Sequence, residues 1–193
     1  MNLLHKRILE ISKKHDLTHL GSCLTAVNII DHIYKQRKPD EPFILSCGHA
    51  GLALYVVLEK YLGQDAEALC LKHGTHPSRN IGEGIYCSTG SLGWGITIAL
   101  GMALSDRSKN VHCLTSDGEA HEGTFWEVAN VMHRYKVDNL KIHLNWNGWA
   151  AYHCVNRDFI ERVKGIFPSI KVWETEVTEY DFKGQEAHYV KCE

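Results

Sequence analysis

The sequence predicts an α/β protein whose mainly parallel sheet is flanked by helices. Short apolar runs alternate along the chain with stripes of helical period, a pattern typical of strands joined by helical crossovers. The run Leu140–Trp146 has the period of two expected of a strand. Asp117-Gly118 and Asn147-Gly148 each end a strand-like run, and each leads into a connection too long for a hairpin. We therefore expect a single domain that spans residues 1–193.

In the first half of the chain, two predicted helices precede the first strand. Apolar positions recur at intervals of four and three from Leu4 to His15, which predicts a helix that stops near Gly21. Thr25 is a suitable N-cap for the second helix. The other elements expected here are a strand at 43–45, an apolar helix over 50–62 and a loop rich in Gly, Ser, Asn and Pro over 73–90.

The second half of the chain repeats a clearer unit of helix and strand. Its strands end in polar residues followed by glycine, and Asn156 is a suitable N-cap for the last helix. The elements expected in order are a helix over 92–104, a strand at 111–115, a helix over 123–135, a strand at 140–146, a helix over 157–164 and a strand near 171–178.

Composition excludes several classes of protein. Lys and Arg number 21 against 23 Asp and Glu, so the chain lacks the positive excess of non-specific nucleic-acid binders. No apolar run reaches the roughly 18 residues of a membrane span, and residues 1–10 do not resemble a secretion signal. The seven cysteines are scattered and form no C-x-x-C pair, as expected of buried thiols in a reducing compartment. We expect a cytoplasmic protein that binds neither nucleic acid nor membrane.

The two strand ends are the first candidates for a functional site. Asp-Gly and Asn-Gly pairs are common turn formers, which is the simpler interpretation. However, both turns are expected at the same edge of the sheet, where open parallel sheets bind ligands. A helix opening through Gly118 and Gly123 would direct free backbone N–H groups at a phosphate. Asp117 and Asn147 would supply oxygen ligands to Mg²⁺ or Ca²⁺, and a phosphate bound at the helix start would share that cation.

These turns belong to a longer pattern. The stretch from Ser116 to Gly123, continued to Asn147, resembles the thiamine diphosphate motif of transketolases, which runs from a GDG triplet through an EG pair to an asparagine. Four upstream segments resemble other motifs of that family, in the same order: HLG at 19–21, SCGHA at 46–50, HP at 76–77 and GSLGWG at 90–95. Ser116, Cys47 and Trp94 depart from the family's glycine, lysine and glutamine. The resemblance implies the thiamine-diphosphate-binding fold of this family.

The resemblance also implies roles for individual residues. The metal, Mg²⁺ or similarly Ca²⁺ or Mn²⁺, would be bound by Asp117, Asn147 and the backbone carbonyl of Trp149. The catalytic residues would be three histidines that exchange protons with ketol oxygens, a role that suits the near-neutral pKa of imidazole. The simpler interpretation is that all three are hydrogen-bonded loop histidines. These are His19, His49 and His76. The residues expected to bind the cofactor are Gly90, Leu92, Asp117, Gly118, Glu119, Asn147 and His188. Apart from the resemblance, His15 and His19 have the four-residue spacing of a helical metal pair, but no third ligand is evident and no zinc site is expected there.

By the same resemblance, the chain is the diphosphate-binding subunit of a two-component transketolase-like enzyme, which transfers a two-carbon ketol unit between sugar-type substrates. Residues 165–193 are too few for the pyrimidine-binding domain that carries the activating glutamate, so we expect a second polypeptide to supply it in an α2β2 assembly. The neighbourhood of Phe125 and Trp126 is expected to face that partner. The alternatives are a subunit of a thiamine-dependent decarboxylating lyase or synthase that uses a 2-keto acid donor, and a non-catalytic homologue.

Overall fold

A computed structural model describes residues 2–177 and 186–189 of the chain. In this part, four parallel strands form one sheet in the order β1-β2-β3-β4. The strands are β1 (Phe43–Leu45), β2 (Val111–Ser116), β3 (Leu140–Trp146) and β4 (Lys171–Glu174). The α-helices are α1 (Leu3–His15), α2 (Leu20–Gln36), α3 (Gly51–Leu62), α4 (Ala66–His73), α5 (Trp94–Ser105), α6 (Gly123–Tyr135), α7 (Arg157–Ile166) and α8 (Glu186–Tyr189).

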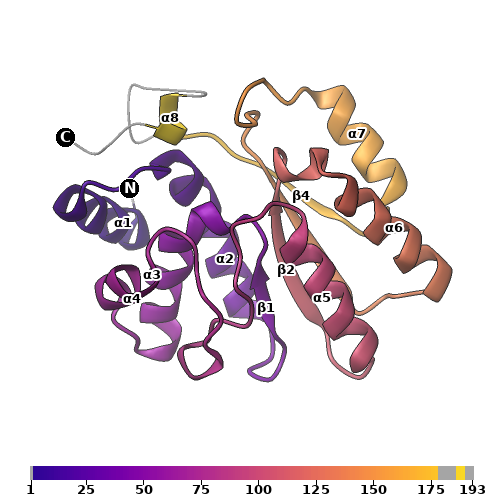
Figure 1. Ribbon diagram of the computed structural model, residues 1–193, viewed down its shortest axis with the longest axis horizontal. Coiled ribbons are helices and arrows are strands. Elements are labelled where there is room, and N and C mark those ends of the chain that lie inside the picture. The colour runs from indigo at the N-terminus through magenta and orange to yellow at the C-terminus, as the bar shows by residue number, and fades with distance from the viewer. Residues whose placement is uncertain (1, 178–185, 190–193) are drawn as a thin grey trace.

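The sheet divides the interior into two hydrophobic cores, with helices on both faces (Figure 1). Alternate residues of a strand point to opposite faces, so Phe43 and Leu45 join the core of α1 to α4. Ile44, between them, joins the core of α5, α6 and α7. β3 is buried along both faces except at Lys141, as expected of a central strand. The predicted α/β fold with a mainly parallel sheet is confirmed.

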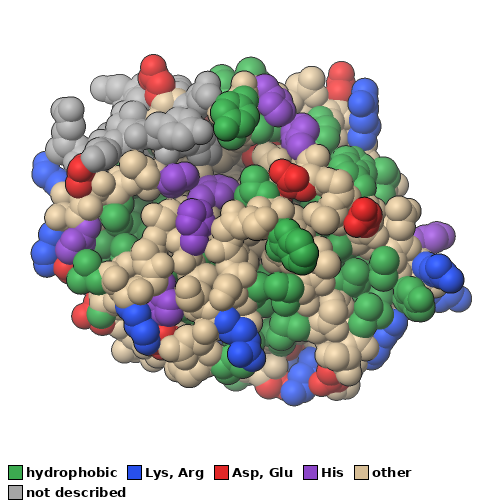
Figure 2. Space-filling view, in the orientation of Figure 1, with side chains coloured by type: hydrophobic (Ala, Val, Ile, Leu, Met, Phe, Trp, Pro, Cys, Tyr) green, Lys and Arg blue, Asp and Glu red, His purple; other side chains and the backbone are tan. Residues whose placement is uncertain are grey.

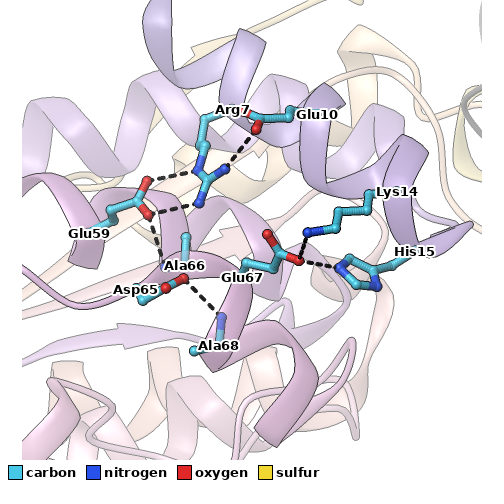
Figure 3. A network of polar contacts seen from close by, with 9 residues as sticks. All are labelled: Arg7, Glu10, Lys14, His15, Glu59, Asp65, Ala66, Glu67 and Ala68. Carbon is cyan, nitrogen blue, oxygen red and sulfur yellow. Dashed lines mark hydrogen bonds and ion pairs between the residues drawn. The ribbon is translucent and has the colours of Figure 1, made fainter.

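Ion pairs attach α1 to the α3–α4 corner (Figure 3). The Arg7 guanidinium donates to both carboxyl oxygens of Glu59, at 3.0 and 3.1 Å, and Glu59 also accepts from the backbone N–H of Ala66. The Glu67 carboxylate lies 2.7 Å from the imidazole of His15. His15 therefore has a structural partner, and the pair with His19 considered above forms no metal site among the described residues.

Most predicted elements are confirmed, and the second helix is the main correction. α2 begins at Leu20, so Thr25 lies inside the helix and is not its N-cap. The Thr25 hydroxyl donates to the carbonyl of Gly21 at 2.9 Å, which satisfies it within the helix. α4 was not expected, because its eight residues have little amphipathic pattern. β4 ends at Glu174, before the expected limit of 178.

Exposure of the aromatic and cysteine side chains separates the interior from the surface. The Phe125 side chain is fully buried, with its ring centroid 4.9 Å from that of Phe167, so it cannot itself contact a partner, whereas the neighbouring Trp126 is partly buried. Cys154 is exposed, and the other five cysteines within the described residues are buried free thiols.

Within residues 2–177 and 186–189, no helix is both long and apolar enough to cross a membrane.

Candidate active site

The two strand-end turns meet at the carboxyl edge of the sheet, as the sequence predicted. Asp117 follows β2, and its backbone N–H donates to the carbonyl of Asn145 near the end of β3. One Asp117 carboxyl oxygen accepts from the N–H of Gly148 at 2.8 Å, and the other accepts from the N–H of Gly118 at 2.9 Å. A single carboxylate thus joins both turns and fixes their relative positions.

Asp117 is the main electrostatic feature of this edge. Its side chain is fully buried, and burial raises the pKa of Asp117 to about 7, although the N–H groups of Gly148 and Gly118 favour the charged form. The described residues that line the adjacent cavity include no Lys or Arg. The Asn147 side-chain oxygen, which accepts from the N–H of Trp149 at 3.0 Å, lies at the same cavity. A buried carboxylate with an amide oxygen nearby is a suitable environment for a hard divalent cation.

The three predicted catalytic histidines line the same cavity, which has a volume of about 390 Å³. His49 follows β1 in a 3-10 turn, His76 lies in the loop after α4, and His19 directly precedes α2. The ring centroids of His19 and His49 are 5.8 Å apart. Burial lowers the pKa of His19, and the nearby His76 lowers it further. Figure 2 shows histidine side chains gathered near the middle of the face of the molecule that it displays. We refer to these three as the cavity histidines.

The backbone around the cavity requires unusual conformations at two positions. His19 has φ +63° and ψ +26°, a left-handed conformation that is uncommon for a residue with a side chain. Gly90 has φ +147°, and a Cβ at this position would lie 3.2 Å from the imidazole ring of His76. The glycine therefore lets the 90–92 segment, with the predicted residue Leu92, pack against a catalytic candidate.

Glu119 lies at the cavity wall, but both of its carboxyl oxygens are occupied by the protein. One oxygen accepts from the Ser46 hydroxyl and from the N–H of Gly93, each at 2.7 Å. The other accepts from the Thr115 hydroxyl at 2.7 Å. Burial raises the pKa of Glu119, against the effect of these donors. The geometry favours a positioning role, in which Glu119 joins the ends of β1 and β2 to the start of α5.

A histidine pair at the cavity was not among the predicted site residues. His121 and His153 both line it, with their Nε2 atoms 3.3 Å apart, and His121 stacks on Phe159. His153 lies in a turn after Asn147, closed by a hydrogen bond from the N–H of Ala150 to its carbonyl. No sequence signal marks this turn as part of the site. The side chain of His188, predicted to bind the cofactor, lies outside the described residues.

Comparison with known proteins agrees with this geometry. The model of the family described as "Transketolase, thiamine diphosphate binding domain" matches residues 7–177. The chain belongs to this family. Its sheet places the transketolase-like motifs of the sequence around one cavity at the carboxyl edge.

Several transketolase proteins are similar to this chain. An apulose-4-phosphate transketolase subunit of Phocaeicola vulgatus is 32% identical over 155 residues, which cover 70% of this chain and 55% of that protein. The 6-deoxy-6-sulfo-D-fructose transketolase subunit SqwG of Clostridium sp. is 30% identical over 166 residues, 76% of this chain and 60% of that protein. Human transketolase is 35% identical over 152 residues, 67% of this chain and 24% of that protein. The chain thus spans little more than half of the two subunits.

The transketolase fold is also found by comparison of structures. The crystal structure of transketolase from Campylobacter jejuni superposes with a TM-score of 0.67 and 18% identity, covering 93% of this chain and 39% of that one. At this identity the similarity establishes the fold, and functional conclusions depend on the residues of the cavity.

Proposed function

We propose that this chain is the diphosphate-binding subunit of a two-component transketolase that transfers a two-carbon ketol unit between sugar-type substrates. The observation that carries the proposal is the convergence of Asp117, Asn147 and the cavity histidines on one cavity at the carboxyl edge of a transketolase-family sheet. Two similar proteins are named as transketolase subunits, which supports a two-component enzyme for this chain as well.

The residues present fit a complex of thiamine diphosphate with a divalent cation. Asp117 would bind Mg²⁺ with its carboxylate, Asn147 with its amide oxygen and Trp149 with its carbonyl. The cation would compensate the buried charge of Asp117, for which the described cavity wall offers no Lys or Arg. Gly118 lines the cavity beside Asp117, where its backbone would lie close to a phosphate group. When bound, thiamine diphosphate supplies the carbon nucleophile of the reaction.

The cavity histidines would hold and move protons at the hydroxyl and carbonyl oxygens of the substrate. Burial lowers the pKa of His19, so its imidazole is neutral near pH 7 and can accept a proton. His49 and His76 lie on different loops, far from His19 in the sequence. In the fold, all three line the same cavity.

The partner polypeptide would supply the pyrimidine-binding domain with its activating glutamate, most simply in an α2β2 assembly. α5 offers a surface for it. This helix is apolar on all sides, and the side chains of Trp94 and Ile98 are 58% and 40% exposed. Figure 2 shows hydrophobic side chains over the α5 and α6 region, beside the histidines. Exposed aromatic and aliphatic groups near a ligand cavity favour a buried interface.

Two experiments test the proposal. Coexpression with the product of the adjacent open reading frame, followed by mass measurement and a ketol-transfer assay, should yield an active heteromer. Activity with 2-keto acid donors alone would instead favour the decarboxylating alternative, and steady ketol transfer by the lone chain would refute the two-component assignment.

The second experiment measures cofactor binding by calorimetry in the assembled enzyme. Asp117→Ala should weaken thiamine diphosphate binding more than Asn147→Ala, because a charged ligand is harder to replace by water. The loss should exceed the roughly 10–100-fold typical of an outer-shell partner. Unchanged binding in Asp117→Ala would show that the metal motif has been assigned wrongly.

A further inference from the structure

A second cavity, of about 420 Å³, lies at the amino edge of the sheet, opposite the candidate active site. We call it the amino-edge cavity. Its wall includes Lys141 and Lys171 from the starts of β3 and β4, Lys38 from the connection between α2 and β1, and two histidines on the sheet face that α2 covers, His112 and His143.

The charge of this wall is strongly positive. Glu41 is its one carboxylate among the described residues, and both of its oxygens are occupied. One oxygen accepts from the Asn110 amide at 2.7 Å, and the other lies 3.0 Å from the backbone N–H of Lys38 and 3.2 Å from Nε2 of His112. These contacts outweigh burial and hold the pKa of Glu41 at about 2, so it stays ionised, with donors at both oxygens and only 4% of the residue exposed.

The three lysines lack carboxylate partners within the part of the chain that the structure describes. None of Lys38, Lys141 and Lys171 forms an ion pair with a described residue. The Lys141 ammonium donates to the carbonyl of Asp138 at 2.8 Å, which leaves its charge uncompensated. The Lys171 ammonium lies 3.0 Å from Nε2 of His32 and 4.0 Å from the ring centroid of Trp173.

A buried histidine adds a directed donor. The indole N–H of Trp173 donates to Nδ1 of His143 at 3.2 Å, so in neutral His143 the proton is on Nε2. The His143 residue is only 8% exposed, and it contributes to the cavity wall. Burial, together with the neighbouring His112, Lys171 and His32, lowers the pKa of His143 to about 3. The described wall of the cavity thus presents N–H donors and positive charge with no accessible anion.

We propose that the amino-edge cavity binds a small phosphorylated molecule through its phosphate group. Several ammonium groups around one volume favour a phosphate dianion over a single carboxylate. His143, which lines the cavity and carries its proton on Nε2 when neutral, would add a hydrogen-bond donor, and the remaining volume can hold a small organic group. The site lies at the opposite edge from Asp117 and Asn147, so it does not depend on the function proposed above.

The test is a titration of the ¹⁵N-labelled 193-residue chain, without Mg²⁺, monitored by NMR. The probes are inorganic phosphate, glycerol 3-phosphate and, as a control without phosphate, glycerol. Backbone amide signals of residues 110–112 and 141–143 should shift saturably with both phosphate compounds and not with glycerol. Tighter binding of glycerol 3-phosphate than of inorganic phosphate supports the proposal. The reverse order would identify the free ion as the ligand and overturn the assignment of a phosphorylated organic molecule.

Two double variants of equal net charge provide the control. Lys141→Ala/Lys171→Ala should weaken binding by about tenfold or more, which corresponds to about 1.4 kcal/mol. Lys13→Ala/Lys164→Ala removes the same charge from α1 and α7 and should change binding by less than about twofold, because exposed distant charges are screened. These four lysines are on or near the surface, so the variants should fold. A shift that does not saturate, or equal weakening in both double variants, would overturn the proposal.

Discussion

Asp117→Asn should stabilise the metal-free chain while it destroys the candidate cation site. Burial raises the pKa of Asp117 from 3.8 to about 7, so the folded chain binds a proton more tightly than the unfolded chain does. Raising the pH from about 4 to above 7 removes a proton that the folded chain binds more tightly than the unfolded chain, so the free energy of unfolding should fall across this range.

The contacts of Asp117 set the size of the change in unfolding free energy. At about 1.36 kcal/mol for each pH unit between the two pKa values, the charged Asp117 costs the metal-free fold about 4 kcal/mol at pH 8. Asn removes this cost, but its amide nitrogen cannot accept from the N–H of Gly148 or Gly118. One buried N–H then loses its acceptor, which costs about 1–3 kcal/mol. The expected net gain at pH 8 is about 1–3 kcal/mol.

The assay is urea unfolding of both proteins between pH 5 and pH 8, with and without Mg²⁺, at constant ionic strength. Without Mg²⁺, the unfolding free energy of the native chain should fall with pH by more than that of Asp117→Asn. With saturating Mg²⁺, the native chain should regain stability and the variant should not, because binding stabilises only the protein that has the site. Parallel pH profiles of the two proteins would show that Asp117 is not the group that destabilises the metal-free fold at high pH.

Three further predictions concern the neighbouring groups. Glu119→Ala should lower the free energy of unfolding by at least about 3 kcal/mol, since three buried donors lose their acceptor, whereas Glu119→Gln should cost less; denaturant melts that do not differ would contradict this. Alanine at each cavity histidine should lower kcat of the assembled enzyme by about 10²–10⁴-fold with little change in cofactor affinity, and full turnover in all three would favour structural loop histidines. Ile98→Glu should prevent assembly with the partner, measured by light scattering, while the circular dichroism of the lone chain stays unchanged; normal assembly would exclude α5 from the interface.

The local pattern of the sequence predicted the second half of the fold well. α6 and β3 have the bounds that periodicity indicated, and Asn156 caps α7 through a 3.0 Å bond to the N–H of Phe159. The meeting of Asp117 with the turn after β3 was also predictable, because parallel strands place their carboxyl ends at one edge. These features depend on short-range patterns or on topology alone.

Features that depend on distant contacts were not predictable in the same way. Thr25 has the side chain of an N-cap, but Asn145, 120 residues away, donates to its hydroxyl inside the helix. The role of Glu119 depends on Ser46, which lies 73 residues earlier in the chain. Hydrogen-bond partners at such separations leave no periodic signal in a single sequence, so only the three-dimensional arrangement assigns them.

The left-handed backbone at His19 sets protein stability against the catalytic role that we propose for this residue. A side chain in this conformation costs about 1–2 kcal/mol, and glycine would avoid that cost. Variant libraries sorted for thermal resistance should therefore enrich glycine or asparagine at this position, whereas libraries sorted for turnover should retain histidine. Ranking substitutions by folded yield alone would discard the imidazole for which we propose proton transfer.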